Sequence, residues 1–260
     1  MGAEAQIHGN MLDIDKGGEA AKRADCRVGV PAELVRLCRS YPQLRPERVL
    51  LTADYVTEAI VGDRESTRRC KTFSHYGMTE TGYGCAVQCD RGEAHHLRHA
   101  DVLVEIVDPL GDARLGAGEV GEVVVTTFLH EAMPLLRYRT GDLASMVTEP
   151  CPCGGALPRL GRVKGRIADI AELGNGAWIT PCELDEAVYR CDGIRDYRAK
   201  IFRRSGTTAL SIAVDAEERA RGMRERFLRD RLPEEIVLDV ACTPLPSSEG
   251  VRKRRIETES

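Results

Sequence analysis

The sequence predicts a mixed α/β protein built from three parts in series, and three observations predict it. Helix-like and strand-like segments alternate over the first part, β-rich runs follow from Asp101, and helices and strands alternate again after Gly165. Alternation of the two periodicities is typical of layered α/β domains, while consecutive short strands indicate a small sheet or barrel. We place the three parts at residues 1–92, 93–165 and 166–260.

The composition excludes several classes of protein. The chain has 260 residues, 42% of them hydrophobic and 30% charged, which is enough for one large domain or two small ones. A formal net charge of -4 argues against a nucleic-acid or membrane-surface binder, because both need a cationic face. No apolar run reaches the ~18 residues that span a bilayer, and residues 1–18 lack the apolar core of a signal peptide. We therefore expect a cytoplasmic protein whose ten cysteines are thiols and metal ligands rather than disulfides.

The first part predicts two helices and two buried strands. Residues 31–41 form an amphipathic helix, because their apolar side chains recur at helical spacing and Pro31 suits the first turn. A strand is expected over residues 48–54 and a second helix over residues 55–63. The next strand is short, "CKTF" at residues 70–73, and a polar loop follows it.

The rest of the chain predicts a β-rich middle and an α/β end. Three apolar runs separated by Gly, Asp and Pro indicate a small sheet, at residues 101–109, 118–128 and 133–146. Thr180 is a predicted helix N-cap with Pro181 at the first helical position. After this helix we expect two strands, a charged helix and a last strand, at residues 197–202, 208–216, 218–230 and 236–243. The final part therefore resembles a βαββαβ unit.

The loop "SHYGMTETGYG", residues 74–84, gathers polar side chains at the end of a predicted strand. In open α/β sheets, ligands collect at such strand ends. The ring of Tyr76 can stack on a base, the hydroxyl of Thr79 can bond phosphate oxygens, and the carboxylate of Glu80 can hold Mg²⁺. A polar surface turn explains the same residues equally well.

A second stretch, "LLRYRTGDLA" at residues 135–144, places a Gly-Asp turn after an apolar strand. An exposed aspartate in such a turn, here Asp142, is a good bidentate acceptor for a ribose diol. "GRVKGR" follows about twenty residues later and ends at Arg166. Taken singly, Asp142 fits an ordinary turn aspartate and Arg166 a solvated linker charge.

In this order the motifs resemble the AMP-forming acyl-CoA synthetase superfamily, and most closely its phenylacetate-CoA ligase branch. The resemblance rests on "SHYGMTETG", "MPLLRYRTGDL" and "GRVKGRIADI" and spans roughly residues 28 to 255. It implies the C-terminal portion of the large adenylate-forming domain, a β-rich subdomain and a small α/β lid. It also implies the reaction: a carboxylate attacks the α-phosphate of ATP to give an acyl-adenylate, and coenzyme A then displaces AMP.

The resemblance assigns roles to six residues. In this family the motif tyrosine packs on adenine beside its glycine, the Thr and Glu handle phosphate and Mg²⁺, the aspartate binds ribose, and the arginine lies beside the interdomain hinge. By motif position these residues are Tyr76, Gly77, Thr79, Glu80, Asp142 and Arg166. An aromatic acid substrate is implied by the resemblance alone, because His75, Gly82 and Tyr83 do not specify an aryl group over an alkyl one.

Three departures from the family pattern stand out. The Ser/Thr/Gly-rich phosphate loop has no counterpart in residues 1–30, which predicts a truncated or fragmentary ligase or one half of a split one. The family's catalytic Gly-Lys pair is replaced by Gly-Val ending at Val251, so Lys253 is the candidate substitute, with a solvated cationic tail as the alternative. Ala168 stands where the family carries the first of two acidic hinge residues, and Asp169 keeps the second.

The cysteines predict a metal site. Cys89 and His96 lie seven positions apart, and Cys151 and Cys153 form a "CPCG" knuckle, so a Cys₃His zinc tetrahedron closes if the two segments meet. His95 competes for the imidazole role, and free thiols in turns are the open alternative. The resemblance favours zinc, since many phenylacetate-CoA ligase-like chains carry these residues. Four protein ligands leave no open position, so we expect a structural ion.

Three functions therefore stay open. The chain is an AMP-forming carboxylate–CoA ligase, or a derived module that holds AMP or acyl-adenylate without using ATP, or a zinc-stabilised interaction domain. The cofactors of the first are ATP, Mg²⁺, coenzyme A and structural zinc. Apolar faces left by an absent subdomain predict association, either as a homo-oligomer or with a missing N-terminal partner chain.

Overall fold

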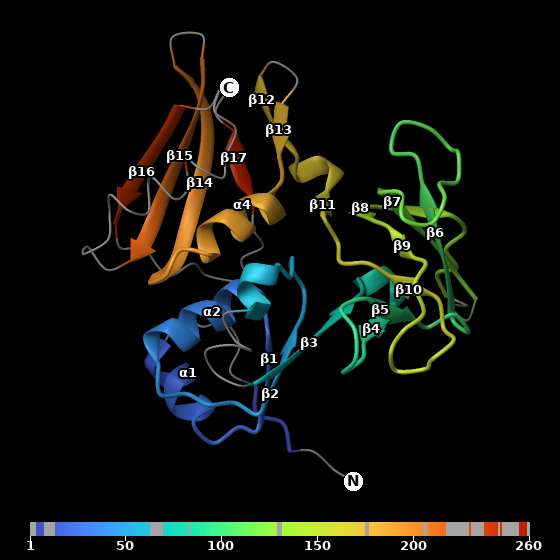
Figure 1. The fold of residues 1–260 in the computed structure, drawn as a ribbon, viewed down its shortest axis with the longest axis horizontal. Helices are drawn as coiled ribbons and strands as arrows, with labels where there is room; N and C mark the ends of the chain where they lie inside the picture. The colour runs from blue at the N-terminus through green and yellow to red at the C-terminus, as the bar shows by residue number, and fades with distance from the viewer. Residues whose placement is uncertain are drawn as a thin grey trace.

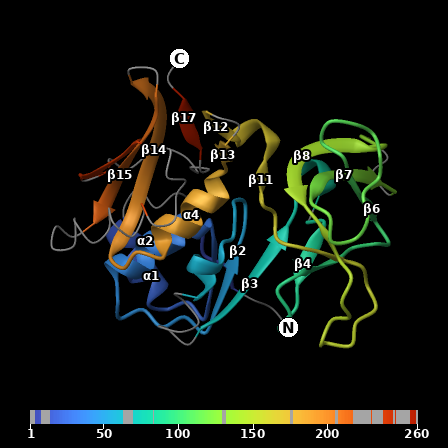
Figure 2. The same ribbon diagram turned by 45° about the horizontal axis from the view of Figure 1, so that its top comes forward.

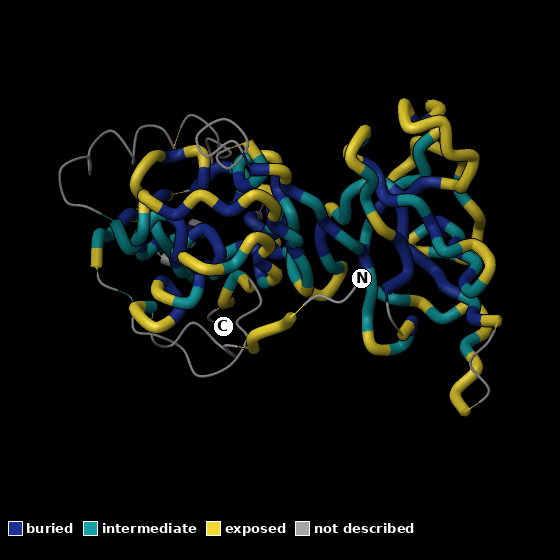
Figure 3. The backbone as a smooth tube through the Cα atoms, turned by 90° about the horizontal axis from the view of Figure 1, so that it is seen from below, coloured by how far each residue is buried: buried dark blue, intermediate teal, exposed yellow. Residues whose placement is uncertain are grey.

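A computed structural model describes residues 4–7, 14–62, 70–82, 84–128, 132–174, 177–204, 207–216, 229, 237–243, 245 and 255–258. Figure 1 shows an α/β part at the N-terminus with a second α/β part above it and a β-rich part to one side. In the view of Figure 3 these form two lobes joined by a narrow waist. The mixed α/β class predicted from the sequence is confirmed.

The first part contains the predicted helix and the two predicted strands, together with a helix and a strand that were not predicted. Parallel strands β1 (Cys26–Gly29), β2 (Arg48–Leu51) and β3 (Lys71–Tyr76) lie beside helices α1 (Ile14–Ala21) and α2 (Pro31–Ser40). Of these, α2, β2 and β3 correspond to the predicted elements, and α1 and β1 are the additional ones. Residues 58–62 are helical.

One expectation about β3 is wrong, because this strand does not end at Phe73. It continues through Tyr76, since His75 and Tyr76 pair with strand β4 (Ala86–Gln88). The strand-end motif therefore starts inside a sheet, and its loop begins at Gly77.

The first sheet turns antiparallel beyond β3. It continues through β4, β5 (His95–Leu97) and β10 (Arg159–Leu160) to β9 (Met146–Val147), giving seven strands. The second sheet has the order β11-β8-β7-β6, with bounds Gly165–Arg166, Tyr138–Ala144, Gly121–Thr127 and Val102–Val107. The first sheet crosses residue 92 and β11 crosses residue 165, so the three-part division stays a prediction.

The Gly-Asp turn expected after an apolar strand is also wrong. Gly141 and Asp142 lie within β8, where the pairing with β7 shifts register between Glu122 and Val124. Gly141 has φ 75°, a left-handed conformation that favours glycine at such a bulge. Asp142 is consequently fixed by a sheet rather than carried on a loop.

The C-terminal part, which we call the lid, is a second α/β unit. Its four-stranded sheet has the order β16-β15-β14-β17, beside a hairpin of β12 and β13 and helix α4. The bounds are Ala171–Gly174 for β12, Ala177–Ile179 for β13, Pro181–Tyr189 for α4, Ile194–Arg204 for β14, Thr207–Ala216 for β15, Val237–Cys242 for β16 and Ile256–Thr258 for β17.

The start of α4 is as predicted. Thr180 Oγ1 accepts a hydrogen bond from the Glu183 backbone N–H at 3.1 Å, and Glu183 accepts one back from the Thr180 N–H at 2.8 Å, with Pro181 in the first turn. Of the helix expected over residues 218–230, only Arg229 is described, and it is helical.

The lid packs directly on the first part. Buried side chains of α2 and β2, such as Leu37 and Leu51, belong to the same hydrophobic cluster as Tyr189 and Ile212 of the lid. Figure 2 shows α4 and β14 lying over α2. The two parts therefore share one core.

Arg39 of α2 fastens this contact. Its guanidinium donates to the backbone carbonyls of Tyr189 at 2.9 Å and Cys191 at 3.4 Å, and also to that of Ile194. It also lies over the Tyr189 ring, 5.8 Å from the centroid. One side chain thus satisfies carbonyls at the C-terminal end of α4, where a cation is favoured.

Replacing Arg39 with methionine is expected to loosen the lid while leaving the apolar stem of the side chain in place. Charge-assisted hydrogen bonds contribute about 1.5–3 kcal/mol each, so several lost bonds should speed amide hydrogen exchange in α4 and the start of β14. Arg36→Met, on the same helix, is the matched control. Equal exchange in both variants would show that apolar packing alone holds the lid.

Within the described residues, no helix is long and apolar enough to cross a membrane.

Candidate functional site

Asp142 is the centre of a polar cluster where β3, β8 and β11 meet. The residue is only 5% exposed, so the expectation of an exposed aspartate is wrong. Tyr76 Oη donates to Asp142 Oδ2 at 3.0 Å, and Arg166 Nε donates to Asp142 Oδ1 at 2.8 Å. Arg166 lies directly opposite Asp142 in the antiparallel pair of β8 and β11, which explains why the two side chains meet. Three residues from three separate motifs are thereby brought together.

The electrostatics of the cluster keep Tyr76 a hydrogen-bond donor. Burial raises the pKa of the Tyr76 phenol well above its usual range, and the negative charge of Asp142 raises it further. A carboxylate oxygen has two lone pairs, so Asp142 can still accept bonds from a ligand. A pair of adjacent hydroxyls, such as a ribose diol, suits this acceptor.

A second hydroxyl–carboxylate pair lies close to the first. Tyr55 Oη donates to Asp169 Oδ2 at 3.1 Å, and Arg255 Nε lies 3.9 Å from Asp169 Oδ1. Burial and the charge of Asp169 raise the pKa of Tyr55. No sequence motif points to Tyr55, which lies between β2 and the helical residues 58–62 rather than in the helix expected from residue 55. Its bond ties the first part to the segment that enters the lid.

The loop after β3 is shaped by a close backbone approach. A Cβ at Gly77 would lie 2.6 Å from the Gly84 Cα, so the position admits only glycine without a backbone shift. Residues Thr79–Thr81 form one 3₁₀ turn (η1). Thr79 is exposed and Glu80 is half-buried, with Tyr138 Oη 3.4 Å from Glu80 Oε1. Thr79 and Glu80 are therefore accessible to a ligand.

Of four further residues named from the sequence, two are placed by the structure and two are not. Lys253 and Tyr83 lie outside the described residues. His75 is on β3 with Nε2 2.6 Å from Thr52 Oγ1, and burial lowers its pKa. Gly82 ends the 3₁₀ turn with φ 72°.

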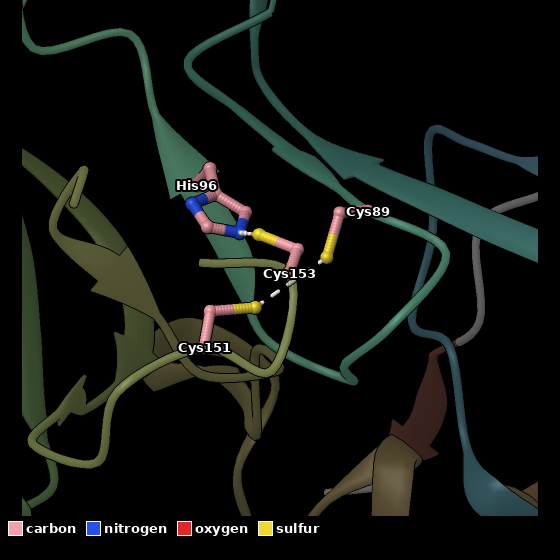
Figure 4. A group of neighbouring side chains, drawn as sticks. All are labelled: Cys89, His96, Cys151 and Cys153. Carbon is pink, nitrogen blue, oxygen red and sulfur yellow. Dashed lines mark hydrogen bonds between the residues drawn. The ribbon is translucent and has the colours of Figure 1, made fainter. Parts of the chain in front are cut away.

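A second cluster consists of Cys89, His96, Cys151 and Cys153. Figure 4 shows the four side chains converging from two segments, one around β4 and β5 and the other before β10. Their ligand atoms all lie within 4.8 Å of one another. The Cys89 and Cys151 sulfurs are 3.5 Å apart, and Cys153 Sγ is 3.5 Å from His96 Nε2.

These separations fit a tetrahedral ion. Bonds of about 2.3 Å to sulfur and 2.0 Å to nitrogen place ligand atoms ~3.5–3.8 Å apart around zinc. The knuckle has the turn this requires: the Gly154 N–H donates to the Cys151 carbonyl at 3.0 Å, and Gly154 has φ 78°. The Gly155 N–H also approaches Cys153 Sγ, at 3.3 Å. The four residues can hold zinc without any other protein ligand.

His95, the competing imidazole, is not part of this cluster. Adjacent residues of a strand point to opposite faces, so His95 of β5 faces away from His96. Its Nε2 lies 2.8 Å from Ser74 Oγ, and burial lowers its pKa to about 4. The strand geometry decides between two histidines that sequence spacing cannot separate.

Known proteins resemble this chain in sequence and in fold. No family model matches the chain. It is 31% identical over 242 residues to a phenylacetate-coenzyme A ligase of Thermus thermophilus, covering 82% of this chain and 54% of that protein. A phenylacetate-coenzyme A ligase of Escherichia coli is 28% identical over 190 residues, covering 67% of this chain and 43% of that protein. The chain spans about half the length of these curated relatives.

The fold has counterparts among solved structures. A 2-hydroxyisobutyryl-CoA ligase in the postadenylation state, in complex with 2-HIB-AMP, superposes with a TM-score of 0.80 at 19% identity, covering 98% of this chain and 58% of that one. The same ligase in the thioesterification state gives a TM-score of 0.54. The chain is therefore a homologue of the phenylacetate-CoA ligases, about half their length, with the fold of the adenylate-forming CoA ligases.

Proposed function

We propose that this chain carries the adenylate-binding half and the lid of an AMP-forming carboxylate–CoA ligase. The observation that carries the proposal is the buried Asp142 carboxylate, which accepts hydrogen bonds from Tyr76 and Arg166. Its relatives named phenylacetate-coenzyme A ligase support the reaction class and favour an aromatic acid.

The proposed reaction has two halves. A substrate carboxylate oxygen attacks the α-phosphorus of ATP, and pyrophosphate leaves with the electron pair of the broken P–O bond. The thiol of coenzyme A then attacks the acyl carbonyl, loses its proton, and expels AMP as the thioester forms. Catalysis of this kind is mainly positioning and electrostatic stabilisation.

The residues divide these tasks. Asp142 holds the ribose hydroxyls, Tyr76 and Gly77 form the adenine side of the site, and Arg166 keeps the Asp142 carboxylate oriented. Thr79, which is exposed, would donate its hydroxyl to a phosphate oxygen. Lys253, outside the described residues, stays the proposed cation for the acyl phosphate.

Two metals belong to the proposal. Glu80, with Thr79 beside it, offers the single carboxylate that Mg²⁺ commonly takes from a protein when nucleotide phosphates supply other ligands, and Mg²⁺ would neutralise phosphate charge there. The cluster of three cysteines and His96 would hold a structural zinc that joins the segment after β4 to the loop before β10. It takes no part in the reaction, because all four positions are occupied by protein.

A partner chain is also proposed. Parallel strands are normally covered on both faces, yet Val28 of β1 is 63% exposed. Leu50 and Phe73 continue the same row across β2 and β3 and are half-buried. We propose that this row packs against another polypeptide, either an N-terminal partner chain or a second copy of this chain. Composition and thiol content support a cytoplasmic setting.

The second candidate is a non-catalytic module that binds AMP or acyl-adenylate. It rests on the buried Asp142, whose contacts with Tyr76 and Arg166 could hold a ribose without any reaction taking place. The third, a zinc-stabilised interaction domain, rests on the Cys/His cluster alone.

The second half-reaction separates these candidates, because it does not require contacts to the β- and γ-phosphates. Synthetic phenylacetyl-adenylate and coenzyme A are mixed with the purified chain, and phenylacetyl-CoA is measured against the rate without protein. We expect acceleration. AMP binding without acceleration would support the non-catalytic binding module. If folded, zinc-loaded protein neither binds AMP nor accelerates the reaction, only the zinc-stabilised interaction domain remains as a candidate.

A further inference from the structure

Glu122 is a buried carboxylate near the start of a strand, directly before three consecutive valines. It lies on β7, and the residue is only 4% exposed. Burying a charge of this kind is costly unless it is paired and hydrogen-bonded. The reason for its presence therefore lies in what it contacts.

Both carboxylate oxygens of Glu122 are used, and both lead to β8. Arg139 Nε and Nη2 lie 2.7 and 2.6 Å from Oε2. The backbone N–H of Gly141 donates to Oε1 at 2.9 Å. Arg139 in turn donates to the carbonyls of Gly111 at 2.8 Å and Asp108 at 3.0 Å, so this hydrogen-bond network also includes the turn after β6.

The Gly141 contact holds the bulge that immediately precedes Asp142. At this bulge the ordinary ladder is interrupted, so its backbone groups need side-chain partners. Glu122 provides one, and Thr140 provides the others: its hydroxyl donates to the Val123 carbonyl at 2.8 Å and accepts from the Asp142 N–H at 3.1 Å. The position of the Asp142 carboxylate depends on these contacts.

We propose that Glu122 is a positioning residue for nucleotide binding, acting through the Gly141 bulge on the ribose-binding carboxylate of Asp142. This inference rests on the proposed function. The proposed action of Glu122 is indirect, because both of its carboxylate oxygens are bonded to β8. Within the same sheet Glu105 makes a comparable ion pair with Arg137 at 3.2 Å, but in the described part of the chain it has no hydrogen bond to the bulge, and this makes it the matched comparison.

The test compares AMP with 2′,3′-dideoxy-AMP, which lacks both hydroxyls that Asp142 would hold. Affinities are measured by calorimetry for the wild type, Glu122→Gln and Glu105→Gln, with zinc content and thermal unfolding recorded for each. The glutamine amide keeps the size of Glu122 but has one acceptor oxygen instead of two, so it cannot serve both Gly141 and Arg139.

We expect Glu122→Gln to weaken AMP roughly tenfold and dideoxy-AMP by less than about twofold, because the lost interaction is with the hydroxyls. Glu105→Gln should leave both affinities unchanged. A variant that weakens both nucleotides equally would show a merely structural role and overturn the inference. A wild type that binds both nucleotides equally well, or neither, would instead overturn the proposed ribose site, and the inference with it.

Glu122→Gln can fail to fold, and a second variant covers that outcome. Thr140→Val removes the acceptor of the Asp142 N–H while keeping a β-branched side chain. It is expected to show the same selective loss for AMP. An unchanged ratio of the two affinities in Thr140→Val would contradict the role of the bulge.

Discussion

Replacing Cys151 with serine is expected to abolish zinc binding at the proposed site and to lower the melting temperature by roughly 10 °C, since structural zinc sites stabilise small folds by several kcal/mol. Cys151 is the most buried of the three cysteines in the cluster, and its sulfur lies 3.5 Å from that of Cys89. Loss of one thiolate leaves the proposed ion with three protein ligands instead of four, so the ion is bound more weakly. The measurements are zinc content per chain and thermal unfolding.

Cys26→Ser is the matched control, because Cys26 is exposed and lies outside the cluster. It should keep one zinc per chain and an unchanged melting temperature. A chelator should lower the melting temperature of the wild type and of the control. It should not lower the melting temperature of Cys151→Ser any further. Metal-free protein with the melting temperature of the untreated wild type would contradict the structural role.

Replacing Asp142 with asparagine is expected to weaken AMP binding by about 100-fold, since charge-assisted hydrogen bonds to a carboxylate contribute roughly 1.5–3 kcal/mol each. The amide matches the carboxylate in shape but has one acceptor oxygen, and it would need to accept from Tyr76, Arg166 and the ribose together. Calorimetric titration of AMP measures the loss.

Two comparisons make this result specific to the ribose site. Asp239→Asn changes an exposed aspartate of β16 and should bind AMP as the wild type does. Tyr76→Phe removes the donor to Asp142 but keeps the ring, so a loss of only a few-fold is expected. Full affinity in Asp142→Asn would remove the observation on which the proposed function rests.

Zinc removal and Asp142→Asn should affect the protein independently. The metal cluster sits between β5 and the loop before β10, whereas Asp142 is on β8 of the other sheet. Distant sites with no shared partner usually contribute additively. A zinc-free variant that still binds AMP would confirm that the metal is structural.

The sequence determined the local features that depend on a few neighbouring residues. Pro31 and Thr180 mark helix starts because proline and a capping hydroxyl satisfy helix ends whatever the surroundings. The CPCG knuckle predicted a metal ligand pair for the same reason. The order of three motifs was enough to identify the relatives of the chain.

Only the tertiary structure decided which of these residues meet. The choice of His96 over His95 depends on the face that each presents across β5, and a shift of one residue would reverse it. The cross-strand partnership of Asp142 with Arg166 depends on the register of β8 and β11. Neither register can be read from either strand alone.

The prediction of a turn at Gly141 was wrong for a related physical reason. Gly-Asp is a local signal for a turn, but pairing with β7 on one side and β11 on the other makes the segment a bulge inside a sheet. The Glu122 carboxylate that holds this bulge carries no local sequence signal of its role. Its partners are 17 and 19 residues away, and only the folded chain brings them to it.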